Sequence, residues 1–209
     1  MCFLTHTKVC VYIENTREFD VAGEHGEWCK HTNFELATHA PMMVHIPGKT
    51  DSGVVSEELT EYVDLFPTLV DAAGLPPMPL CPRNSSQVAL CREGTSLMPL
   101  IDAARGSPGS GGDGASCWKK RVFSQYPRGG GIMGYSMRTA RYRYTEWVKF
   151  DHKTYTPDWS QSAGVELYDH GVDPEENHNV ASKAGYKTLV AGLSKMLHAG
   201  WRSAQGQLR

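Results

Sequence analysis

The sequence predicts an α/β region, followed by a small α+β subdomain that is built from an antiparallel sheet and a C-terminal helix. Two short apolar runs, residues 9–13 and 42–46, have the composition of buried strands, and an amphipathic helix follows at residues 59–74. Beyond a Gly/Ser-rich stretch at residues 105–117, strand-like runs lead to a second amphipathic helix at residues 186–197.

The Gly/Ser-rich stretch is the expected boundary between the two parts. Its composition favours a flexible linker over any packed element. We therefore expect a first domain over residues 1–104, a linker over residues 105–117 and a C-terminal subdomain over residues 118–209.

Composition and charge exclude several classes of protein. The chain has 209 residues, of which 40% are hydrophobic, so a packed core is expected rather than global disorder. A formal net charge of −2 predicts no strong attraction to nucleic acid or to anionic membranes. No apolar run reaches the length that a bilayer span requires. Residues 1–8 lack the basic start and long apolar centre of a signal peptide.

In the first region, residues 23–47 form a polar segment that runs into the second apolar strand. Gly23 and Gly26 disfavour a helix there and allow tight backbone turns. Pro47 and Gly48 close the strand. A polar, glycine-hinged loop before a buried strand is typical of the places where α/β enzymes carry their chemistry.

The loop contains several chemically useful side chains. Lys30 is a point charge that can hold a sulfate or phosphate group, and Trp28 can form an apolar wall against a sugar ring. Three histidines, His25, His31 and His39, are candidate acids, bases or ligands. Each also has a structural interpretation, because an isolated lysine is usually solvated and an isolated histidine usually makes structural hydrogen bonds.

The helix expected at residues 59–74 has clear end signals. Asp64 can cap its start, Pro67 is tolerated only near that start, and Gly74 suits the position just after its last turn. Its apolar face is expected to pack in the core, and consists of Leu65, Phe66, Leu69, Val70 and Ala73.

The six cysteines indicate a disulfide rather than a zinc site. They are Cys2, Cys10, Cys29, Cys81, Cys91 and Cys117. None forms a Cys-x-x-Cys pair, which disfavours structural zinc. Cys81 and Cys91 flank a polar loop in which Asn84 begins an N-glycosylation sequon. A cysteine pair around a sequon favours an oxidising, secretory compartment. The alternative is two free thiols and a chance sequon.

The second half reads as a sheet carrying one helix. Strand-like runs at residues 121–126, 132–138, 142–148 and 165–168 have short connections, which favour an antiparallel meander. The final helix most simply covers this sheet, and its apolar face consists of Tyr186, Leu189, Val190, Leu193 and Leu197.

Several stretches, in order along the chain, carry a family resemblance. They are GEHGEWCK at residues 23–30, FELATHAP at 34–41, VDLFPTL at 63–69, MGYSMRT at 133–139 and ELYDH at 166–170. Together they resemble the sulfatase family of the alkaline-phosphatase-like superfamily, and within it the iduronate-2-sulfatases.

The resemblance implies a sulfuric ester hydrolase that acts on the 2-O-sulfate of heparan and dermatan sulfate, in the lysosome or secreted. Lys30 matches the lysine with which the family contacts the sulfate, and Cys81 to Cys91 matches the spacing of a disulfide loop in the iduronate-2-sulfatases. The fold implied is the C-terminal part of the alkaline-phosphatase-like α/β fold. Residues 9–13 and 42–46 would then belong to its central parallel sheet.

The chain departs from the family at its catalytic centre. No cysteine begins the Cys-x-Pro-Ser-Arg motif from which the family makes its formylglycine nucleophile. The positions that match the family's calcium-binding Asp-His pair are Arg17 and Glu18. We therefore expect a C-terminal fragment that binds no calcium itself, has no activity alone, and has the missing N-terminal sulfatase portion as a partner.

Two alternatives stay open from the sequence. The first is a non-catalytic protein that either binds sulfated glycosaminoglycan or is a partner of a full-length sulfatase. The basic residues that would bind an acidic polysaccharide are Arg138, Arg141, Arg143 and Lys149. Such strand residues are also commonly solvated or paired. The second is a phosphate-ester hydrolase of the same superfamily, against which Trp28 and the cysteine loop argue.

Overall fold

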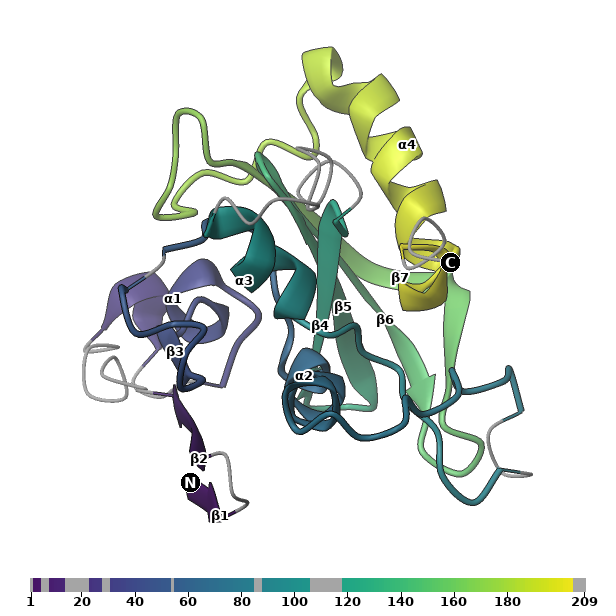
Figure 1. The fold of residues 1–209 in the computed structure, drawn as a ribbon. Helices are drawn as coiled ribbons and strands as arrows, with labels where there is room; N and C mark the ends of the chain where they lie inside the picture. The colour runs from purple at the N-terminus through teal and green to yellow at the C-terminus, as the bar shows by residue number, and fades with distance from the viewer. Residues whose placement is uncertain are drawn as a thin grey trace. The chain divides into compact units, whose positions relative to one another are not determined.

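The computed structural model describes residues 2–4, 8–13, 23–27, 31–53, 55–84, 88–105 and 118–204 (Figure 1). The chain forms two compact units. Unit 1 consists of Met1–Glu14, Met42–Lys119 and Gln205–Arg209, and unit 2 consists of Asn15–Pro41 and Lys120–Ala204. The stretch Asn15–Pro41, which lies within the first part expected from the sequence, groups with unit 2. Residues 106–117 of the expected linker lie outside the described residues.

Unit 1 contains a three-stranded sheet in the order β1 (Cys2–Leu4), β2 (Lys8–Ile13) and β3 (Met42–His45). Both strands expected from the sequence are therefore present, but β3 alternates between half-buried and exposed residues and is not the buried strand that its composition predicts. The expectation that they belong to a parallel sheet is wrong for this pair, because Cys10 pairs with His45 and Ile13 with Met42, which is an antiparallel register.

The helical part of unit 1 starts later than expected. A short 3-10 helix, η3 (Tyr62–Asp64), leads into α2 (Leu65–Ala72), and α3 (Met98–Ala104) follows further along. Gly74 has φ 65° just after α2, where the amide of Leu75 donates to the carbonyl of Val70 at 3.0 Å. This is the glycine stop that the sequence predicts.

The apolar face predicted for α2 is only partly right. Its buried residues are Pro67 and Thr68, while Phe66 is 49% exposed. This difference follows from the burial of Asp64, because the first turn of the helix faces the interior with its polar residue and leaves Phe66 toward solvent. The carboxylate of Asp64 accepts from Lys119 Nζ at 2.8 Å and from the amide of Thr95 at 2.8 Å. It also accepts from the amide of Glu61 at 2.8 Å in a capping box, so Asp64 caps the start of the helical stretch at η3 and makes no capping bond to α2 itself.

The predicted disulfide is present in unit 1. Cys81 and Cys91 are bonded, with their Cα atoms 4.9 Å apart, so the interpretation as two free thiols is wrong. Arg92 ties the end of the loop to the preceding segment, because the amide of Cys81 donates to its carbonyl at 2.9 Å. Asn84 is exposed within the loop.

Unit 2 is an antiparallel meander carrying one helix, as predicted. The strands follow one another in the sheet as β4 (Arg121–Arg128), β5 (Ile132–Thr139), β6 (Tyr142–Asp151) and β7 (Thr156–Asp169). The chain then forms η5 (Ala184–Tyr186), α4 (Lys187–His198) and η6 (Trp201–Ser203).

Helix α4 packs along one face of this sheet (Figure 1). The core between them is apolar and consists of Met137, Tyr144, Leu167, Val180, Leu193 and Leu197, with Tyr186, Leu189 and Val190 packed against it. The predicted apolar face of the helix is therefore confirmed. Within the described residues, no helix is both long and apolar enough to cross a bilayer.

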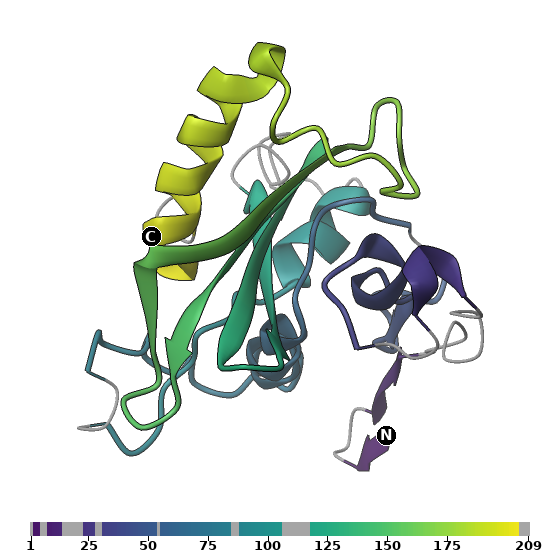
Figure 2. The same ribbon diagram turned by 180° about the vertical axis from the view of Figure 1, so that it is seen from behind.

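Strand β7 is longer than predicted and bends sharply (Figure 2). The register explains the bend, since Trp147 pairs with Gly164, Val148 with Ser162 and Lys149 with Asp158. Between these pairs, β7 contains residues that have no partner on β6. They form β-bulges, and bulges bend a strand and increase its local twist. One of these residues, Trp159, lies 4.1 Å from the ring of His198 on α4. The largely polar composition of this half of β7 gave no strand signal.

Candidate functional site

The candidate loop of unit 2 contains two short helical turns, η2 (Glu24–Gly26) and α1 (Glu35–Thr38). Gly23 and Gly26 have φ of 108° and 71°, so the tight turns predicted from these glycines are confirmed. Lys30 and Trp28, the two functional candidates of the sequence, lie outside the described residues.

The sheet face opposite α4 combines a polar row with the aromatic side chains of Tyr126, Trp147 and Tyr168. Alternation along the strands places a cross-strand row on it, in which Ser124 pairs with Ser136, Ser136 with Thr145 and Thr145 with Glu166. Thr145 Oγ1 donates to Ser136 Oγ at 2.8 Å. A polar row of this kind needs polar partners if it is to be covered.

Asn33 supplies such partners from the loop. Its side-chain amide donates to the carbonyl of Gly134 at 3.1 Å, and its carbonyl oxygen accepts from Ser124 Oγ at 3.1 Å. Asn33 is buried. The loop is therefore fixed on this face by specific hydrogen bonds, and not by apolar contact alone.

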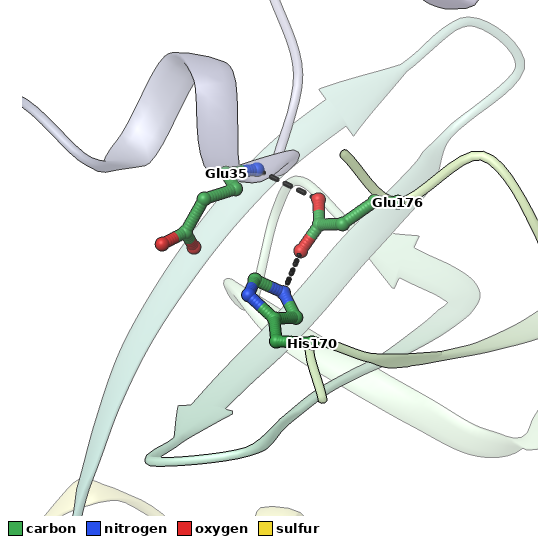
Figure 3. Close-up of side chains that lie close together, drawn as sticks. All are labelled: Glu35, His170 and Glu176. Atoms are coloured by element: carbon green, nitrogen blue, oxygen red, sulfur yellow. Dashed lines mark hydrogen bonds and ion pairs between the residues drawn. The ribbon is translucent and has the colours of Figure 1, made fainter. Parts of the chain in front are cut away.

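A buried carboxylate, Glu176, anchors the next part of the loop (Figure 3). One of its oxygens accepts from Arg143 Nε at 2.5 Å and from His170 Nε2 at 2.7 Å, and the other accepts from the amide of Glu35 at 2.7 Å. A carboxylate only accepts, so His170 carries its hydrogen on Nε2. Its Nδ1 then accepts from Arg138 Nη2 at 2.8 Å.

The side chain of Glu35 completes the cluster. It accepts from Arg143 Nη2 and from Arg138 Nε at 3.1 Å, and its other oxygen lies 3.2 Å from His39 Nδ1. Burial would raise the pKa of Glu35, but the guanidinium groups of Arg143 and Arg138 outweigh it, so the pKa lies below the usual value. We call Glu35, Arg138, Arg143, His170 and Glu176 the anchor cluster.

The anchor cluster does not fit a metal ion. Glu35, His170 and Glu176 offer ligand atoms within 4.8 Å of one another, which is a spacing that a cation could use. However, two guanidinium groups already neutralise the two carboxylates, and both oxygens of Glu176 accept hydrogen bonds. A calcium ion would displace Arg143 from the interior, and the cluster is better described as a buried ion-pair network.

The basic residues proposed for polysaccharide binding do not form a free patch. Arg138 and Arg143 are bound within the anchor cluster. Arg141 makes a two-pronged ion pair with Asp169, at 2.7 and 2.8 Å, and Lys149 donates to the carbonyl of Gly130. This arrangement disfavours the binding-protein alternative.

The histidines of the loop have structural partners. His25 stacks on Phe34, with ring centroids 4.0 Å apart, and its Nε2 donates to the carbonyl of Glu175 at 3.0 Å. His39 lies beside Glu35, one helical turn away. These contacts favour the structural interpretation over a catalytic one.

The anchor cluster itself was not predicted from the sequence. His170 lies in one of the family-like stretches and Arg143 is one of the basic strand residues, while Glu176 lies in none of the stretches given above. A usable signal was present, because Arg143 is flanked by Tyr142 and Tyr144, and Ser136 by Tyr135 and Met137. Buried charges need partners, so such positions indicate a second polar segment packed on the sheet.

Removing the charge of Glu35 should change how the stability of unit 2 depends on pH. A carboxyl whose pKa is lowered in the folded state stabilises above its unfolded value, near 4.5, and this contribution is lost as pH falls through the folded value. We expect Glu35→Gln to be less stable at pH 7, and to lose less stability between pH 5 and pH 3. Urea unfolding at several pH values measures this.

The control for this experiment is Glu175→Gln, at an exposed position beside the anchor cluster. Burial raises the pKa of Glu166, so the contribution of Glu166 to stability changes with pH in the direction opposite to that of Glu35. The quantity to compare is therefore the difference in unfolding free energy between wild type and variant at each pH. Parallel pH curves for wild type and Glu35→Gln would contradict the ion-pair role of Glu35.

Known proteins resemble the chain in sequence and in fold. A family model described as "N-sulphoglucosamine sulphohydrolase, C-terminal" matches residues 23–202. The iduronate 2-sulfatase of Mus musculus is 36% identical over 82% of this chain and 38% of its own length. The iduronate 2-sulfatase of Homo sapiens is 35% identical over 76% of this chain and 36% of its own length.

Among solved structures, a protein in complex with its substrate D-glucosamine-2-N,6-O-disulfate matches with a TM-score of 0.62. It is 21% identical, and the match covers 95% of this chain and 35% of that one. At this identity the likeness establishes the fold alone. The chain spans less than two fifths of the length of each of these relatives.

Proposed function

The chain belongs to the sulfatase family that has the N-sulphoglucosamine sulphohydrolase C-terminal region, and on this premise we propose that it is the C-terminal part of an iduronate-2-sulfatase-like sulfuric ester hydrolase. Its fold is that part of the alkaline-phosphatase-like sulfatase fold. The observation that carries the proposal is the identity of 36% over 82% of the chain with an iduronate 2-sulfatase.

The proposed substrate is a glycosaminoglycan, heparan or dermatan sulfate, from which the enzyme removes the 2-O-sulfate of iduronate. Lys30 would contact the sulfate, where an ammonium group stabilises the negative charge that develops as the ester bond breaks. Trp28 would form an apolar wall beside the sugar ring. The anchor cluster supports this assignment, because it fixes the segment that follows Lys30 on the sheet.

The nucleophile and the calcium ion of the family would come from residues outside this chain. The Cys-x-Pro-Ser-Arg motif does not occur in the 209 residues, and the anchor cluster does not fit calcium. When bound, the metal would neutralise sulfate charge. We infer that the 209 residues supply one wall of the site and work with an N-terminal sulfatase portion.

The proposed location is the lysosome or the secretory pathway. The disulfide between Cys81 and Cys91 suits an oxidising compartment. Asn84 is exposed, as a glycosylated asparagine must be. Mass spectrometry of the chain expressed in animal cells behind an added secretion signal, with and without glycosidase treatment, would reveal a glycan on Asn84.

The function is tested by release of inorganic sulfate from a 2-O-sulfated iduronate disaccharide. We expect no turnover by the chain alone, with or without calcium. Co-expression with the part of mouse iduronate 2-sulfatase that precedes the match should restore turnover. In this two-part enzyme, Lys30→Met should lower the rate by about a hundredfold or more, as expected for loss of a charge-stabilising contact.

The matched control is Lys187→Met, at an exposed position at the start of α4, which should keep the wild-type rate. Turnover by the chain alone would contradict the proposed division of the site. A two-part protein that binds heparin at physiological salt without releasing sulfate would favour the binding-protein alternative instead.

A further inference from the structure

We propose that residues 173–181 close the outer edge of β7 and keep this edge from pairing with a second copy of the chain; we call these residues the clasp. The strand order places β4 and β7 at the two edges of the sheet of unit 2. An edge strand presents backbone N–H and C=O groups on which another strand can pair, and natural proteins protect such edges. β4 contains Pro127, which has no N–H to offer. β7 requires another form of protection.

The side chain of Asn179 supplies this protection. Its amide nitrogen donates to the carbonyl of Val165 at 3.0 Å, and its Oδ1 accepts from the amide of Leu167 at 3.0 Å. The backbone amide of Val180 then donates to the carbonyl of Leu167 at 2.9 Å. A side-chain amide offers the same donor and acceptor as a peptide unit, so Asn179 occupies the place that a neighbouring strand would take on β7.

Backbone contacts within the clasp hold Asn179 in this orientation. Its Oδ1 also accepts from the amide of Ala181 at 2.9 Å. Earlier in the clasp, the carboxylate of Asp173 accepts from the amides of Asn177 and His178 at 3.0 and 2.8 Å, which fixes the turn that leads to Asn179. The side-chain amide is therefore held on the edge strand by contacts on both sides of it in sequence.

The clasp crosses from one face of the sheet to the other. Near its start, the buried Glu176 belongs to the anchor cluster on the face opposite α4. At its end, the buried Val180 packs in the core between the sheet and α4. Glu176 has φ 58°, a left-handed conformation that a non-glycine residue keeps only where its surroundings hold it. Two buried residues thus anchor the clasp on both sides of the edge, with Asn179 between them.

The first half of β7 is protected in a different way. Ser162 and Gly164 pair with β6, while Ala163 between them does not, and the strand bends at its bulges (Figure 2). A bulged and strongly twisted strand is a poor template for pairing. The regular part of the strand resumes at Val165, which is where the contacts of Asn179 begin. The clasp therefore covers the part of the edge that the bulges leave open.

The experiment compares Asn179→Ala with Asn177→Ala in the full chain, by hydrogen exchange with mass spectrometry. Asn177 is exposed in the same clasp and contributes its backbone amide, which alanine keeps. In dilute protein, we expect the amide hydrogen of Leu167 to exchange about tenfold faster in Asn179→Ala than in wild type, because its acceptor is lost. Asn177→Ala should exchange at the wild-type rate.

Raising the protein concentration shows whether the opened edge pairs. Asn179→Ala should then form larger species in light scattering, and the amide of Leu167 should regain its protection, because a second copy supplies the missing acceptor. Wild type and Asn177→Ala should show neither change. Wild-type exchange at Leu167 in dilute Asn179→Ala would overturn the proposal. An opened edge that does not associate would also overturn it, and so would an association that leaves the Leu167 amide unprotected.

If Asn179→Ala does not fold, the wild-type protein still decides whether the clasp acts as one unit. The amides of Leu167 and Ala181 donate to the same oxygen of Asn179, so native-state exchange by NMR in increasing urea should give both amides the same opening free energy. Unequal opening would contradict the clasp. Every contact involved lies within unit 2, so the outcome does not depend on the proposed function.

Discussion

Replacing Arg143 by methionine is expected to lower the free energy of unfolding by about 3 to 5 kcal/mol. Arg143 is almost completely buried and binds Glu176, Glu35 and Thr38. Methionine fills a similar volume but leaves two carboxylates without their main counter-charge. An unpaired buried charge is costly, because the interior solvates it poorly. Urea unfolding at pH 7 with circular dichroism measures the loss.

The matched control is Arg141→Met in the same sheet. Arg141 binds Asp169 with similar geometry, but its side chain is 58% exposed. Water screens the Arg141 side of this pair, and the buried Asp169 keeps its hydrogen bonds from Gly171 and Tyr186, so the loss should be clearly smaller than that of Arg143→Met. Equal losses for the two variants would contradict the claim that burial makes the Arg143 contacts decisive.

Gly94→Ala is expected to destabilise unit 1 by about 3 kcal/mol or more. A Cβ atom at Gly94 would lie 1.9 Å from the backbone carbonyl oxygen of Val63. No side chain can move aside to relieve this contact, so the backbone itself must shift. The shift would also disturb the amide of Thr95, which donates to the buried Asp64 at 2.8 Å.

Gly74→Ala provides a graded comparison within unit 1. Gly74 has φ 65°, and a Cβ atom there would meet open space, so only the backbone conformation is strained. The expected loss is about 1 kcal/mol. A Gly94→Ala variant no less stable than Gly74→Ala, in thermal and urea unfolding, would show that the close approach to Val63 is not required.

Local patterns predicted much of the fold. The meander of unit 2, helix α4, the stop at Gly74 and the Cys81–Cys91 disulfide all depend on periodicity, short connections or nearby residues. The pairing of β2 with β3 does not, because a stretch that belongs to unit 2 separates the two strands. Neither strand by itself indicates whether the pairing is parallel or antiparallel.

The candidate site was predictable in a different way. Lys30 was found by resemblance, since nothing in an isolated lysine distinguishes a ligand from a solvated side chain. The anchor cluster was missed because Glu35 and Arg143 lie 108 residues apart, so that no sequence window contains both.

The central claim is that buried contacts in unit 2 fix the loop of the proposed sulfate site on the sheet. The most direct test is a double-mutant cycle with Glu35→Gln, Arg143→Met and the double variant, measured by urea unfolding at pH 7. The account predicts a coupling free energy of about 2 kcal/mol between the two residues. A coupling below about 0.5 kcal/mol would show that Glu35 does not depend on Arg143, and would contradict the account.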